Sequence, residues 1–78
     1  MKVNPYRYYK ECYKDNVVEY SIVYVDEKYV YLIACKYFDK PLIKYKENDK
    51  WWGTIKTLQL YSKDIIELTK EDLFLELL

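Results

Sequence analysis

The chain has 78 residues, which is enough for one domain, and we take residues 1–78 as a single domain. Lys and Arg together number 13, as do Asp and Glu, so the formal net charge is zero. Apolar residues make up 51%, which indicates a folded globular protein rather than a disordered one. No apolar run reaches the roughly 18 residues of a membrane span, and the N-terminus lacks a signal-peptide core. We therefore expect a cytoplasmic protein without membrane contact.

The residue types that most enzymes use are scarce. The chain has no histidine, which removes the usual general base and the usual metal ligand. Its one glycine, Gly53, cannot form a glycine-rich phosphate-binding loop. Cys12 and Cys35 lie far apart without a CxxC pair, and we interpret Cys35 as a small buried apolar residue. We expect no enzymatic activity, no metal and no other cofactor.

The first predicted element is a short helix over residues 5–14. Asn4 can cap a helix, and Pro5 suits the first helical position. Spacings of three and four place three rings on one helical face: Tyr6, Tyr9 and Tyr13. A strand is the alternative, because tyrosine favours extended structure.

The next pattern predicts a β-hairpin. Residues 17–25 and 28–38 are both rich in β-branched and aromatic side chains, and Asp26-Glu27 separates them. Strict alternation places Val18 on one face with Ile22, and it places Cys35 on the face opposite Leu32. Both faces of the second strand are apolar, so we expect both faces of the sheet to be covered.

Three shorter strands should follow, over residues 42–46, 51–60 and 65–68. Trp51 and Trp52 are adjacent in the second of these, so their side chains should point to opposite faces. One indole is therefore expected in the core and the other in solvent. Thr69, with Asp72 three residues later, is typical of a helix cap, and we expect a terminal helix docked through Leu73, Phe74 and Leu77. A single helix over residues 62–78 is the alternative.

These elements predict an α+β, mainly β fold. It would be a small antiparallel barrel or a meander sheet of four or five strands, with a short helix at each end. Over roughly residues 17–68, the strand order and the tight turn before a short last strand resemble small SH3-like barrels. The resemblance includes no motif of that class, and it implies no functional residue.

Charge and aromatic content are both unevenly distributed. Residues 27–60 hold seven lysines and four acidic residues, whereas residues 61–78 hold two lysines and five acidic residues. The chain also has 11 tyrosines, more than a domain of this size can hide with every hydroxyl satisfied. Some aromatic side chains should be exposed and should mark an interaction surface. The alternatives are a solvated surface without a partner and tyrosines packed beneath the helices.

Two functions fit this sequence. The first is a small non-enzymatic protein-binding module, of the kind that phages and viruses encode to inhibit host machinery such as defence systems or nucleic-acid enzymes. It would act in the host cytoplasm as a monomer or homodimer. Five residues are predicted to bind the partner protein: Tyr45, Trp51, Trp52, Glu67 and Glu76. We expect Glu67 and Glu76 to have no structural role.

The second function is that of a small-barrel nucleic-acid-binding protein. Three aromatic residues would stack on bases, Tyr45, Trp51 and Trp52, and four lysines would follow the phosphates: Lys44, Lys46, Lys50 and Lys56. The zero net charge and the single arginine favour the first function, because affinity for a nucleic-acid backbone grows with the number of phosphates neutralised.

Overall fold

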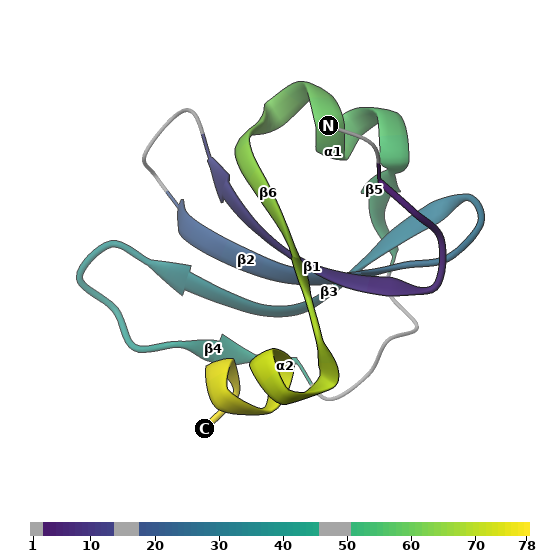
Figure 1. Cartoon of the computed structure of the whole chain (residues 1–78). Coiled ribbons are helices and arrows are strands. Elements are labelled where there is room, and N and C mark those ends of the chain that lie inside the picture. Colours follow the sequence, from purple (N-terminus) through teal and green to yellow (C-terminus); the bar gives the residue numbers. More distant parts are fainter. Residues whose placement is uncertain (1–2, 14–17, 46–50) are drawn as a thin grey trace.

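The computed structural model describes residues 3–13, 18–45 and 51–78. One antiparallel sheet has the strand order β4-β3-β2-β1-β6, and β5 also pairs with β3. The strands are β1 Arg7–Tyr13, β2 Val18–Val25, β3 Tyr29–Tyr37, β4 Ile43–Lys44, β5 Trp51–Thr54 and β6 Ser62–Leu68. The helices are α1 Ile55–Tyr61 and α2 Lys70–Glu76. Figure 1 shows α1 above the sheet and α2 below it.

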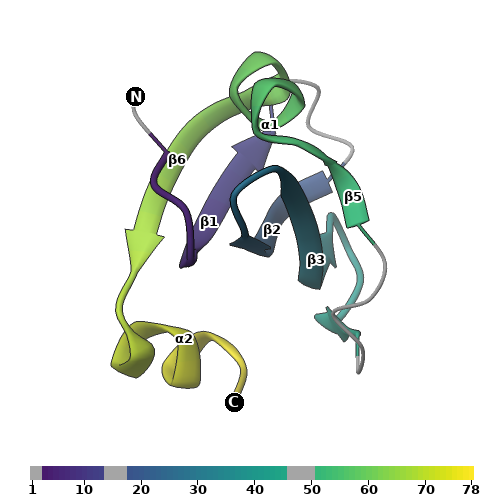
Figure 2. The same cartoon turned by 90° about the vertical axis from the view of Figure 1, so that its right-hand side faces the viewer.

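The sheet is open at both edges. In the described part of the chain, β6 pairs only with β1, and both β4 and β5 pair only with β3. Figure 2 shows the curled sheet with α1 spanning from the β5 side to the β6 side. The mainly β, antiparallel prediction is confirmed, but the sheet does not close into an SH3-like barrel. Neither helix in the described ranges is long and apolar enough to cross a membrane.

The predicted N-terminal helix is wrong, because β1 occupies most of that segment. Tyr9 pairs with Val23 of β2 on one side and with Glu67 of β6 on the other. A central strand gains backbone hydrogen bonds on both sides, and tyrosine packs well on a pleated surface. The end predicted for this helix, Lys14, lies outside the described residues. Pro5 forms a turn before the strand instead of starting a helix.

The predicted hairpin is confirmed as β2 and β3. Asp26 holds its turn, because its Oδ1 accepts hydrogen bonds from the backbone N–H of Lys28 at 2.7 Å and of Tyr29 at 2.6 Å. These two bonds hold the pKa of the Asp26 carboxyl below its usual range. Such side-chain bonds to the following backbone replace the Asn-Gly or Asp-Gly pair that tight hairpins usually need.

Two register shifts in this hairpin overturn the faces predicted by strict alternation. Ile22 pairs with Ala34 while Val23 pairs with Leu32, which leaves Ile33 as an extra residue. A second shift lies between Val18 and Tyr20. Each extra residue moves the following side chains to the other face. Cys35 therefore lies with Leu32, and Val18 lies on the face opposite Ile22.

The core has two parts, one on each face of the sheet. The first is the α1 face, with the buried residues Val3, Tyr9, Val23, Val25, Val30, Leu32, Cys35 and Leu58. The second is the α2 face, with the buried residues Ile22, Ile33, Ala34 and Leu68, against which Leu73 and Leu77 pack. The prediction that both faces of the sheet are covered is confirmed.

The strand predicted over residues 51–60 ends early, because α1 begins at Ile55. Thr54 caps the helix: its side chain accepts a hydrogen bond from the backbone N–H of Thr57 at 3.3 Å. Ile55 and Leu58 are three residues apart, so the helical turn places both against the α1 face. This helical spacing, and not the strand composition, decides the structure here.

The terminal helix is confirmed, and its start at Thr69 rules out one helix over residues 62–78. Thr69 and Asp72 form a capping box: Thr69 Oγ1 accepts from the Asp72 N–H at 3.1 Å, and Asp72 Oδ2 accepts from the Thr69 N–H at 3.3 Å. Leu73 and Leu77 dock on the sheet as predicted, but Phe74 is 65% exposed. The preceding segment is the strand β6.

Candidate functional site

Trp51 and Trp52 are both exposed, at 60% and 58%. The prediction that one of them lies in the core is therefore wrong. β5 is a short edge strand, and α1 follows it at once, so Ile55 and Leu58 cover the sheet in place of an indole. Trp51 packs against Tyr29, with ring centroids 5.3 Å apart. We call Tyr29, Trp51 and Trp52 the aromatic edge.

A pocket of about 210 Å³ lies beside Trp52. Its lining comes from β1, β3, β5 and α1: Glu11, Tyr13, Val30, Trp52, Gly53, Thr54, Thr57 and Leu58. Trp52, Thr54 and Thr57 are exposed, whereas Glu11, Val30 and Leu58 are buried. The pocket thus has an accessible aromatic and hydroxyl rim and a buried floor that contains one carboxyl group. We call it the carboxylate pocket.

Glu11 is only 2% exposed, and both of its carboxyl oxygens accept hydrogen bonds. Tyr13 Oη donates to Oε1 at 2.7 Å, and Ser62 Oγ donates to Oε2. Burial raises the pKa of Glu11, and the two hydroxyl donors offset part of that effect. No Lys or Arg in the described ranges forms an ion pair with it.

The hydroxyl network continues into the core. Tyr13 Oη also lies 3.1 Å from Ser21 Oγ, and Ser21 Oγ lies 3.5 Å from Cys35 Sγ. Burial, together with the neighbouring Glu11, raises the pKa of Tyr13 well above its usual value, so Tyr13 remains a donor at neutral pH. These bonds hold the carboxyl group of Glu11 in a fixed position at the floor of the pocket.

Glu76 has a structural role, contrary to the sequence-based expectation. Lys10 Nζ donates to Glu76 Oε1 at 2.9 Å and lies 4.2 Å from the centre of the Tyr20 ring. Burial acts to lower the pKa of Lys10, but the hydrogen bond and charge of Glu76 outweigh it, and the pKa rises. This ion pair joins α2 to β1 across the sheet face.

Glu67 also has partners within the chain. Its Oε1 lies 3.6 Å from Arg7 Nε and accepts a hydrogen bond from Tyr9 Oη at 3.4 Å. A separate groove of about 490 Å³ lies between β6 and α2, and Glu67 is not part of its lining. Its lining is Lys10, Ile66, Leu68, Asp72, Leu75 and Glu76, and we call it the β6–α2 groove.

The predicted site residues are divided between opposite edges of the sheet. Trp51 and Trp52 lie at the β5 edge, whereas Glu67 and Glu76 lie on β6 and α2 at the other edge. Tyr45 follows β4 and is 39% exposed. The structure therefore does not bring the five predicted protein-binding residues into one surface.

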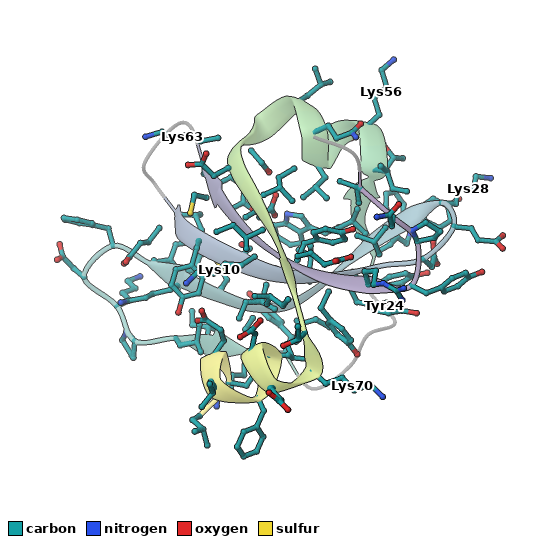
Figure 3. The ribbon with its side chains drawn as sticks, viewed as in Figure 1. Lys10, Tyr24, Lys28, Lys56, Lys63 and Lys70 are labelled. Carbon is teal, nitrogen blue, oxygen red and sulfur yellow. The ribbon has the colours of Figure 1, made fainter. Side chains whose placement is uncertain are left out.

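The lysines of the nucleic-acid hypothesis are also scattered. Lys44 on β4 and Lys56 on α1 are exposed, while Lys46 and Lys50 lie outside the described residues. Figure 3 shows labelled lysines projecting from different ends of the molecule: Lys28, Lys56, Lys63 and Lys70. They do not form a continuous basic stripe over the part of the surface that the structure describes.

The two cysteines lie on opposite faces of the sheet. Cys12 pairs with Tyr20, whose ring packs on the α2 face, while Cys35 is buried in the α1 face. The interpretation of Cys35 as a small buried residue is confirmed at 3% exposure. Across the described ranges, no group of three His, Cys, Asp or Glu side chains is placed to hold a metal ion.

The sequence-based prediction missed Glu11, the central residue of the carboxylate pocket. The helix predicted over residues 5–14 would place Glu11 on the side opposite Tyr9 and Tyr13, whereas β1 places it on the same face as those two residues. The only local signal was the alternation of Tyr9, Glu11 and Tyr13 at every second position. Thr54 and Thr57 were missed because their capping spacing lies within a segment rich in strand-forming residues.

Comparisons with protein families, with curated proteins and with solved structures found no match to this chain.

Proposed function

We propose that this chain is a non-enzymatic protein-binding module that contacts its partner through the aromatic edge. The observation that carries the proposal is the exposure of two adjacent tryptophans, at 60% and 58%, on an edge strand. Tryptophan is among the residues most enriched in the energetically dominant parts of protein interfaces. Transferring these rings from water to a partner surface would be favourable, because each ring carries a large apolar area.

The size of the chain fits an inhibitor that acts by covering a surface. A specific complex buries about 800 Å² on each partner. The accessible surface of this protein is 5735 Å², so an interface of that size needs about one seventh of it. We propose that the target is a larger protein of the host machinery, and that the source is a phage or virus.

Nucleic-acid binding has less support from the geometry. Trp51 packs against Tyr29, whereas Trp52 lines the carboxylate pocket, so the two rings do not form one platform for successive bases. Trp52 also shares its pocket with the carboxyl group of Glu11, which repels phosphate when it is ionised.

The test compares two variants as bait in an extract of the host cell. The double variant Trp51→Ala/Trp52→Ala removes the aromatic edge, and Phe74→Ala removes a ring of similar exposure on α2. We expect the first variant to lose the captured partner and the second to keep it. The purified partner should then bind the double variant at least about tenfold more weakly by calorimetry.

Two results would contradict the proposal. One is equal binding of the partner by the double variant and by the Phe74→Ala protein. The other is capture that disappears after nuclease treatment, together with salt-dependent binding of oligonucleotides to the purified chain.

A further inference from the structure

The volume of the carboxylate pocket and the burial of its lining residues suit a site for one side chain. Its volume of about 210 Å³ far exceeds the roughly 10–15 Å³ that a single water needs, but it is smaller than the roughly 300–1,000 Å³ of sites for drug-sized ligands. The exposed rim holds Trp52, and the buried floor holds Glu11. A long side chain with an apolar stem and a polar end would match this gradient.

The floor of the pocket favours a positive charge. Glu11 is buried, and the described residues supply hydroxyl donors but no cation to it. A buried carboxylate without a counter-ion is costly, and an incoming cation offsets that cost. The raised pKa of Glu11, caused mainly by burial, is consistent with this lack of a counter-ion.

We infer that the carboxylate pocket receives a lysine side chain of the partner protein, with its ammonium group at Glu11 and its aliphatic stem against Trp52. This inference rests on the proposed protein-binding function. Trp52 belongs to both the aromatic edge and the pocket rim, so a partner that covers the edge is positioned to insert a side chain beside it.

The hydrogen bonds at Glu11 favour lysine over arginine. Each carboxyl oxygen already accepts from one hydroxyl, Tyr13 Oη at Oε1 and Ser62 Oγ at Oε2. A guanidinium group binds carboxylates best as a planar fork that engages both oxygens, and here both are partly occupied. An ammonium group is compact and can approach the remaining lone pair of one oxygen.

The test uses a blocked lysine, N-acetyl-lysine N-methylamide, and the same compound acetylated on its ε-nitrogen. The two differ mainly in the positive charge, because acetylation removes it. Binding is followed by NMR through the indole N–H of Trp52 and the backbone N–H of Gly53. We expect saturable shifts with the lysine compound, and an affinity about ten- to a hundredfold lower for the acetylated one, as for a hydrogen bond to a charged group.

Variants locate the interaction. Glu11→Gln keeps the shape of the floor and removes its charge, so it should lower the affinity for the lysine compound to that of the acetylated one. Glu67→Gln removes an exposed carboxylate at the other edge and should leave the affinity unchanged. Should Glu11→Gln not fold, Trp52→Ala at the exposed rim, together with the acetylated compound, provides the same test on folded protein.

Three results would overturn the inference. The first is equal binding of the two compounds, and the second is NMR shifts confined to the β6–α2 groove. The third is full affinity for the lysine compound in a folded Glu11→Gln protein. Failure of the inference can be told apart from failure of the proposed function. Partner capture that depends on Trp51 and Trp52 without any response to the lysine compound overturns the inference alone. A saturable response to the lysine compound with partner capture independent of both tryptophans overturns the protein-binding function of the aromatic edge.

Discussion

The two edges of the sheet use their functional groups in different ways. At the β6 edge, Glu76 pairs with Lys10 at 2.9 Å, and Glu67 lies 3.6 Å from Arg7. At the aromatic edge, two indoles are mostly exposed, and the nearby Glu11 has hydroxyl donors but no cationic partner among the described residues. The acidic residues that stood out in the sequence thus support the fold, whereas the tryptophans remain available to a partner.

This difference shows why a surplus of charge in one segment is a weak guide to function. The acidic C-terminal segment includes carboxylates whose partners lie on β1, at the other end of the chain. Their contribution depends on burial: exposed pairs contribute little, and partly buried pairs with a good hydrogen bond contribute more.

We expect the largest loss of stability when Leu58, a buried residue that lines the carboxylate pocket, is truncated. Leu58 of α1 is 5% exposed and packs in the α1 face. Leu58→Ala should lower the free energy of unfolding by about 2–5 kcal/mol, as for other buried leucines. Lys56→Ala, at an exposed position of the same helix, should change it by about 0.5 kcal/mol or less. Urea denaturation measures both, and equal losses would show that α1 is not docked as described.

The next largest effect is a difference in stability between variants that break the two ion pairs at the β6 edge. The side chains of Lys10 and Glu76 are 25% and 26% exposed, whereas those of Arg7 and Glu67 are 59% and 46% exposed. Glu76→Lys should destabilise the protein by about 1.5–3 kcal/mol, because it removes a charged hydrogen bond and places a like charge beside Lys10. Glu67→Lys should cost about 0–1 kcal/mol. Denaturation at low and high salt checks this, and an unchanged stability of Glu76→Lys would contradict a structural ion pair.

Truncating the aromatic edge should have a smaller effect on folding. Trp51→Ala should cost about 0.5–1.5 kcal/mol through the lost contact with Tyr29. Trp52→Ala should change stability by about 0.5 kcal/mol or less, the range for exposed positions. Thermal unfolding of the two single variants tests this expectation. A loss of about 3–5 kcal/mol in either variant would place that indole in the core and weaken the case for a binding edge.

We expect reducing agent to have no effect on the melting temperature. Cys12 and Cys35 project from opposite faces of the sheet, so they cannot reach the short separation that a disulfide requires. Dithiothreitol should leave the melting temperature of the monomer unchanged. An increase or decrease of several degrees on reduction would contradict the placement of the two strands.

Several elements were correctly predicted because their signals are local. The β2–β3 hairpin follows from two runs of β-branched and aromatic residues around a short polar turn, and Asp26 fixes that turn through its immediate neighbours. The start of α2 follows from Thr69 and Asp72, which satisfy each other's backbone donors within three residues. The covering of both sheet faces follows from the apolar character of both sides of β3. In each case the interacting groups are close in the sequence.

Other features were decided only by contacts between distant residues. Tyr9 could belong to a helix or a strand by local preference, and pairing with β2 and β6 selected the strand. The extra residue Ile33 depends on the register between two strands, which composition does not specify. Glu11 became a buried carboxyl group because Ser62 reaches it from 51 positions away, and Glu76 was paired by Lys10 from 66 positions away. Local pattern determined where strands and helices can form, whereas register and long-range pairing determined which side chains remain available for binding.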